Sequence, residues 1–172
     1  MKLILSDTPL SVVDGTQDSG IKFIDLSALK IANCIGCYGC WTKTPGKCVI
    51  RDDAVKVYPC IAKSDTLLYI SKVKYGSYDT VMKTMLERAI PVQQAFIRLL
   101  DGEAHHVQRD VALKNATIIG YGSIDDKEKD IFRRLVARNA RNMNFESYEV
   151  LFVSEEALEE TVRKEVFKWE RS

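Results

Sequence analysis

Four cysteines that lie within fifteen residues are the side chains best suited to chemistry: Cys34, Cys37, Cys40 and Cys48. Two residues separate each of the first three, so one loop can present sulfur to several irons, and a fourth thiolate nearby can complete a four-iron cluster. Zinc is a poorer match, because no histidine and no second cysteine pair accompanies the run. Small cysteine side chains can also pack a loop against a neighbouring subunit, so cluster binding and packing both remain open.

The rest of the chain predicts alternating strands and helices. Five apolar runs are expected to be strands, at residues 2–6, 21–26, 66–71, 116–120 and 148–153. Several are continuously apolar, which is typical of strands buried on both faces of a parallel sheet. Helical patterns lie at residues 52–63, 77–100, 125–142 and 154–169, with Pro91 interrupting the second. This alternation predicts βαβ units with right-handed crossovers.

The first crossover is unusually short. Only residues 7–20 lie between the first two strands, and they are rich in Ser, Asp, Gly and Thr. A parallel crossover needs about a dozen residues or more and is usually a helix. We therefore expect the first crossover helix to be short or missing.

Length and charge limit the class of protein. The 172 residues, 46% of them apolar, suit a single domain spanning residues 1–172. Lys and Arg total 25 and Asp and Glu total 24, so electrostatic capture of nucleic acid or of an anionic membrane is not expected. The apolar runs are too short to span a bilayer, and the first residues do not resemble a signal peptide. The cytoplasm is therefore the default expectation. In such a reducing compartment, clustered cysteines indicate a metal, an iron–sulfur centre or redox chemistry more than disulfides.

Several segments resemble flavodoxin-fold NAD(P)H-dependent FMN reductases and the related iron–sulfur flavoproteins. The run from Cys34 to Cys48, followed by Asp52 and Asp53, carries the most specific similarity, and residues 71–78, 102–109 and 132–143 add to it. The resemblance implies an α/β, flavodoxin-like three-layer sandwich with a five-stranded parallel sheet in the order 2-1-3-4-5. It also implies FMN as the cofactor, NAD(P)H as the electron donor, and a quinone, a free flavin or an iron–sulfur centre as the acceptor.

The same resemblance gives the expected cofactor contacts. Residues Tyr75, Gly76, Ser77 and Tyr78 would lie at the flavin ring, Ser6 and Thr8 would be remnants of the phosphate-binding turn, and Tyr121 and Gly122 would follow the fourth strand. Cys34, Cys37, Cys40 and Cys48 are the candidate ligands of a 4Fe-4S cluster, and no catalytic residue is assigned. A homodimer or homotetramer is also implied, and the aromatic Tyr38 and Trp41, in a loop with little core to cover them, agree with it.

The chain departs from the family at the phosphate turn. The family has a Gly-Ser-Pro-Arg-type turn whose backbone N–H groups hold the FMN phosphate, whereas this chain has Asp7-Thr8-Pro9. A carboxylate in an anion cradle should weaken phosphate binding, so we expect weaker FMN binding than in the relatives. The alternative function is a flavodoxin-fold subunit that has lost FMN and serves in assembly or regulation.

Two further sets of polar residues are expected to be structural. His105 and His106 should point to opposite faces of an extended segment, so metal binding by the pair is not expected. Glu87 and Arg88 are expected to form a solvated helix face or ion pairs.

Overall fold

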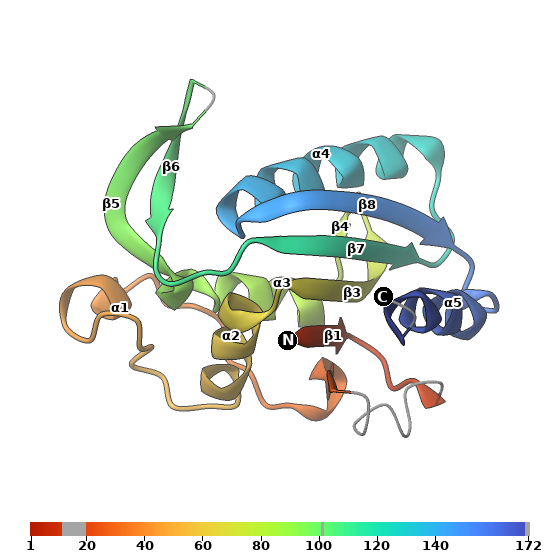
Figure 1. Cartoon of the computed structure of the whole chain (residues 1–172), viewed down its shortest axis with the longest axis horizontal. Coiled ribbons are helices and arrows are strands. Elements are labelled where there is room, and N and C mark those ends of the chain that lie inside the picture. The colour runs from red at the N-terminus through yellow and green to blue at the C-terminus, as the bar shows by residue number, and fades with distance from the viewer. Residues whose placement is uncertain (12–19, 101, 171–172) are drawn as a thin grey trace.

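The computed structural model describes residues 1–11, 20–100 and 102–170 of the chain. Within them, five parallel strands form one sheet in the order β2-β1-β3-β7-β8 (Figure 1). Their bounds are Lys2–Ser6 (β1), Ile21–Asp25 (β2), Thr66–Lys74 (β3), Lys114–Tyr121 (β7) and Phe145–Val153 (β8). This confirms the predicted flavodoxin-like sheet. The prediction of a missing first helix falls mainly on residues 12–19, which lie outside the described residues.

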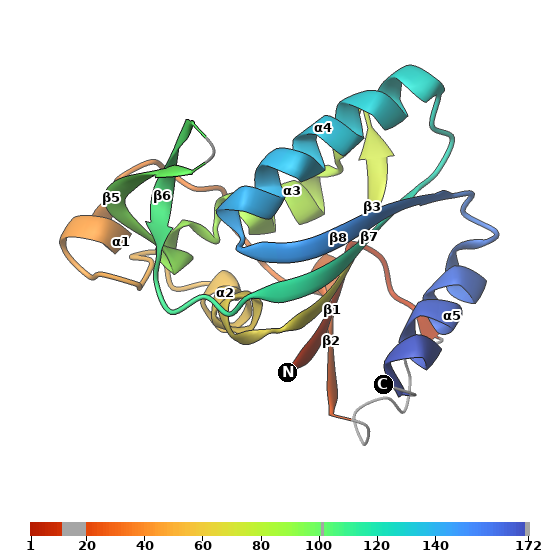
Figure 2. The same cartoon turned by 45° about the horizontal axis from the view of Figure 1, so that its top comes forward.

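Alternate residues of each central strand enter different cores. Leu3 and Leu5 of β1 pack in one core, together with buried residues of α2 (Ala54–Lys63), α3 (Thr80–Glu87) and α4 (Asp126–Asn142). Ile4 enters the other core, where it meets Leu158 and Val162 of α5 (Leu158–Glu170). Successive side chains of a strand point to opposite faces, so helices on both faces require strands that are apolar throughout. Figure 2 shows α4 and α5 on opposite sides of the sheet.

The predicted helix at residues 77–100 is wrong over most of its length. The segment contains the short strand β4 (Ser77–Tyr78), then α3, then the 3-10 turn η4 (Ile90–Val92) and finally strand β5 (Gln93–Leu100). Pro91 lies in η4, where it ends the helical path. Beyond it, β5 pairs antiparallel with β6 (Glu103–Gln108), and tertiary pairing overrides the helix propensity of the Gln, Ala and Leu residues.

The β5–β6 hairpin projects from the body of the molecule at the end where the parallel strands begin (Figures 1 and 2). Glu103 anchors it to α4, because its carboxylate accepts hydrogen bonds from Arg138 and Arg141. His105 Nδ1 lies 3.1 Å from Asn142 Oδ1, while His106 faces the other side and packs on Trp41, with ring centroids 4.6 Å apart. The two histidines therefore point to opposite faces, as expected.

Three shorter elements complete the described part of the chain. They are η3 (Leu26–Ala28), α1 (Gly39–Thr42) in the cysteine loop, and a hairpin turn that joins β3 to β4. None of the described helices is long and apolar enough to cross a membrane.

The Glu103 anchor predicts a pH-dependent contribution to stability. Its hydrogen bonds with Arg138, His105 and Arg141 lower the pKa of Glu103 to about 2. Since this pKa is depressed on folding, the stabilisation is present above pH 4.5 and is lost as the pH falls through about 2. Glu103→Gln should therefore lower the urea midpoint at neutral pH, and the difference from the unmodified protein should shrink as the pH approaches 2.

The matched control is Glu160→Gln, which breaks an exposed pair with Lys164 on α5. Exposed pairs of this kind contribute little. An effect of Glu103→Gln that is no larger than that of the control, or that does not change with pH, would contradict the anchor.

Candidate functional site

In open α/β sheets, ligands bind at the carboxyl ends of the strands, where the strand order reverses. In this sheet that position lies between β1 and β3. The chain leaves β1 toward β2 on one side, and leaves β3 toward β7 on the other, so the crossovers diverge there. Asp7 follows β1 immediately, and its backbone N–H donates to the carbonyl of Ile70 on β3 at 3.1 Å. The first residue after β1 is thus fixed against the neighbouring strand.

The Asp7 carboxylate is held by donors from both other central strands. One oxygen, Oδ2, accepts from Ser71 Oγ and from the Lys72 backbone N–H, both at 2.8 Å. The other oxygen, Oδ1, accepts from the Tyr121 hydroxyl at 2.9 Å. Burial raises the pKa of Asp7, while the bonds from Ser71, Tyr121 and Lys72 lower it, and the net direction is upward. We call Asp7, Ser71, Lys72 and Tyr121 the Asp7 cluster.

Donors of Ser6, Thr8 and Ser11, in the described part of this segment, are also engaged within the chain. The Thr8 N–H donates to Ser6 Oγ at 3.2 Å, and Ser6 Oγ donates to the Thr8 carbonyl at 2.7 Å. Pro9 has no N–H, and both the N–H and the hydroxyl of Ser11 donate to Glu159. The Lys72 ammonium pairs with Glu155. An FMN phosphate does not fit among these described residues, because the donors named above are satisfied and the position carries a carboxylate.

The predicted cofactor residues divide into two groups. Ser6, Thr8 and Tyr121 meet at the Asp7 cluster, and Gly122 follows, with its N–H bonded to the Val153 carbonyl at 3.1 Å. The segment of residues 75–78, by contrast, is the β3–β4 hairpin, which turns toward α4.

The turn of that hairpin exposes one aromatic ring. Tyr75 and Gly76 have φ angles of 54° and 71°, the pattern of a two-residue hairpin turn. A Cβ at Gly76 would lie 2.6 Å from the Ile131 side chain, so the turn is closely packed on α4. Tyr75 is 93% exposed and free to contact a ligand. Tyr78 is buried, with its ring edge against Phe132 at 4.9 Å between centroids.

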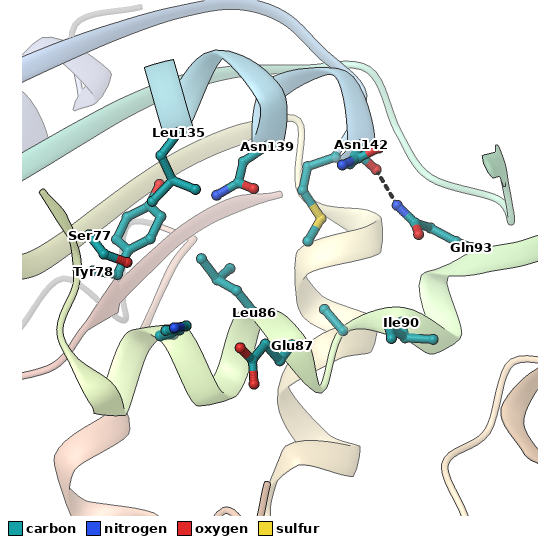
Figure 3. Close-up of a pocket in the computed structure, with 12 residues that line it drawn as sticks. Ser77, Tyr78, Leu86, Glu87, Ile90, Gln93, Leu135, Asn139 and Asn142 are labelled. Carbon is teal, nitrogen blue, oxygen red and sulfur yellow. Dashed lines mark hydrogen bonds between the residues drawn. The ribbon is translucent and has the colours of Figure 1, made fainter. Parts of the chain in front are cut away.

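Ser77 and Tyr78 line a pocket of about 280 Å³ between α3 and α4 (Figure 3). Leu86 and Leu135 point into it from the two helices, and Asn139 adds an amide group. Its volume lies just below the usual range for small-molecule sites. Ser77 and Tyr78, which were expected at the flavin ring, therefore line this pocket between α3 and α4 and are not part of the Asp7 cluster.

The four clustered cysteines surround a second, much smaller hollow. Cys34, Cys37, Cys40 and Cys48 all line one apolar space of about 30 Å³. Burial raises the pKa of the Cys40 thiol, and the nearby Cys48, Cys34 and Cys37 raise it further. In the part of the chain that the structure describes, no three His, Cys, Asp or Glu side chains are arranged to hold a single metal ion. A four-iron cluster bonds each thiolate to a different iron, so its ligands stand farther apart.

Arg88 joins the cysteine loop to the core and was not expected to do so. It is 1% exposed, and its guanidinium donates to both oxygens of Asp52, at 2.6 and 2.9 Å, and to the Ala32 carbonyl at 2.7 Å. Its Nη2 also lies 3.4 Å from Cys48 Sγ. Although burial opposes it, the Arg88 hydrogen bond holds the pKa of Asp52 below its usual value. One feature of the sequence indicated that Arg88 is buried. Arg88 follows the buried Met85 by three residues, and residues three apart lie on the same face of a helix.

Comparisons with known proteins agree with the fold. No family model matches the chain. A curated protein named iron–sulfur flavoprotein, from Archaeoglobus fulgidus, is 34% identical over 77 residues, which are 44% of this chain. The match covers 34% of that protein, so the chain spans about a third of the length of the curated relative it matches.

Solved structures match nearly the whole chain. An FMN-dependent NADH-azoreductase from Bacillus anthracis, in complex with FMN, has a TM-score of 0.58 at 12% identity. The match covers 99% of this chain and 98% of the azoreductase. An NAD(P)H:quinone oxidoreductase from Methanothermobacter marburgensis has a TM-score of 0.55 at 12% identity, with 99% and 96% coverage. Smu.1420 from Streptococcus mutans reaches 0.62 at 12% identity, with 99% of both chains covered. The chain therefore has the flavodoxin-like fold that these proteins share.

Arg88 predicts a large loss of stability on substitution. Arg88→Met would leave the Asp52 carboxylate with only the backbone N–H groups of Ala32 and Ala54 as donors. Removing one partner of a buried ion pair costs up to roughly 3–5 kcal/mol. The urea-unfolding free energy should fall by about that amount. Arg134→Met, which removes an exposed pair with Asp130 on α4, should change it little. Equal effects of the two variants would contradict the anchoring role of Arg88.

Proposed function

We propose that the chain is a flavin-dependent NAD(P)H oxidoreductase that transfers electrons to a quinone, a free flavin or an iron–sulfur centre. The flavodoxin-like fold and the named iron–sulfur flavoprotein support this proposal. The observation that carries it is the convergence of Cys34, Cys37, Cys40 and Cys48 on one hollow. Four thiols brought together from one loop can serve as ligands of a metal centre or take part in redox chemistry.

The flavin would bind at the carboxyl ends of the parallel strands, where ligands of such sheets bind. A bound flavin would accept a hydride from NAD(P)H and return two electrons to the acceptor. The chain would supply the exposed ring of Tyr75 and the neighbouring Lys74, which forms an ion pair with Asp79 at 3.0 Å. An aromatic ring can stack on the flavin, and a nearby ammonium favours a reduced, anionic ring.

The cysteine hollow would hold a 4Fe-4S cluster, with Cys34, Cys37, Cys40 and Cys48 as ligands. A space of about 30 Å³ is close to that of one water molecule, so cluster binding requires the loop to open. Cys34 and Cys37 are exposed and can move outward, whereas Arg88 fixes the position of Cys48. We also propose the cytoplasm as the location, where the reducing conditions keep cysteine thiols available as ligands.

The two proposed sites lie at opposite ends of the sheet. The carboxyl ends of the strands carry the Asp7 cluster, and the cysteine loop with α1 lies at the end where the strands begin (Figure 1). We therefore propose that electrons pass from the flavin of one subunit to the cluster of a neighbouring subunit, and not between the two sites of one chain. A homodimer or homotetramer agrees with this, as do the exposed Phe96, Ile97 and Leu99 of the projecting hairpin.

Anaerobic reconstitution with iron and sulfide tests the cluster. The protein should turn brown and bind about four irons per chain, and Cys37→Ala should lose the colour because one thiolate is missing. Cys60→Ala is the matched control, since Cys60 does not line the hollow. Equal iron binding by both variants, or none by the unmodified chain, would contradict the cluster.

The flavin part of the proposal needs its own measurement. Oxidation of NADH or NADPH by the purified protein should depend on added flavin and follow the concentration of the chain. A protein that binds no flavin and oxidises neither nucleotide would support the alternative, a non-catalytic subunit that serves in assembly or regulation.

A further inference from the structure

We propose that the Asp7 carboxylate is a built-in substitute for a ligand's phosphate, and that the site therefore takes a flavin without a phosphate, such as riboflavin, in preference to FMN. The choice of a flavin rests on the proposed function. The substitution of phosphate by Asp7 rests on the geometry of the Asp7 cluster alone.

The donors around Asp7 form an anion cradle. A backbone N–H, an alcohol and a phenol converge from the ends of β3 and β7 on two carboxylate oxygens, at 2.8 to 2.9 Å. Such donors, at the carboxyl ends of the central parallel strands, are also what would bind a phosphate. Asp7 fills the cradle from within the chain, and its own N–H is bonded to Ile70, which keeps the backbone in place.

Among the residues that the structure describes, the lysines beside the cluster are already engaged with carboxylates. The two lysines near the cluster are both paired, Lys72 with Glu155 and Lys74 with Asp79. Glu159 approaches from α5 and accepts from Ser11. A phosphate placed beside the Asp7 carboxylate would meet like charge in a partly buried position, which is strongly unfavourable. An uncharged ribityl tail meets no such repulsion.

Removing the carboxylate should create an anion site. Asp7→Gly removes the carboxylate that accepts from the Lys72 N–H and from the Tyr121 hydroxyl. It also removes one acceptor of the Ser71 hydroxyl, which keeps the Lys72 carbonyl at 3.1 Å. Formate or inorganic phosphate should then bind and raise the thermal midpoint of Asp7→Gly in a saturable manner, relative to chloride at the same ionic strength. The unmodified protein should show no such rise, because its cradle is filled.

Asp79→Gly is the matched control. This substitution removes a carboxylate near the same edge of the sheet, and that carboxylate caps α3 and pairs with Lys74. Formate or phosphate should not restore the stability of this variant. Formate that stabilises the unmodified protein or Asp79→Gly as much as Asp7→Gly would overturn the assignment of the cradle.

Flavin titrations test the ligand class. Fluorescence quenching should show that the unmodified protein binds riboflavin at least about tenfold more tightly than FMN, and that Asp7→Gly reverses or abolishes this order. Tighter FMN binding by the unmodified protein would overturn the proposal. Binding of neither flavin would overturn the flavin preference together with the proposed function, while anion rescue of Asp7→Gly would still establish the cradle.

Discussion

The carboxylate of Asp7 connects the ends of the three central strands, and the candidate ligand site depends on this connection. It extends from the end of β1 and accepts hydrogen bonds from Ser71 and Lys72 on β3 and from Tyr121 on β7. In a sheet of this order, the same edge is where a ligand would otherwise satisfy such donors. The chain thus supplies, from within, an anion for donors of the kind that can also bind a ligand's phosphate.

A second buried charge organises the opposite end of the molecule. Arg88 binds Asp52 and the Ala32 carbonyl, and it reaches Cys48, so the cysteine loop has one fixed end and one exposed end. A loop of this kind can open around Cys34 and Cys37 without losing its attachment. Each end of the sheet therefore depends on one charged side chain whose partners come from distant parts of the sequence, and both arrangements require nearly all of the fold to be in place.

The sequence predicted the elements whose evidence is local. Continuous apolar runs identify strands buried on both faces, and the five parallel strands follow in the predicted order. The β5–β6 hairpin was missed, because residues such as Gln93 and Leu99 favour a helix until pairing with β6 decides otherwise. The position of Asp7 after β1 was readable, but its three donors come from residues 64 to 114 positions away. Tyr78, expected at a flavin ring, packs on Phe132.

A crystal structure of the chain grown with FMN in excess would test the central claim most directly. We expect the Asp7 carboxylate to keep its bonds to the Lys72 N–H and the Tyr121 hydroxyl, with no phosphate in the cradle. Any flavin density should lie beside Tyr75, with its tail outside the cluster. A structure in which Asp7 has turned away and the FMN phosphate accepts the bonds from Ser71, Lys72 and Tyr121 would contradict it.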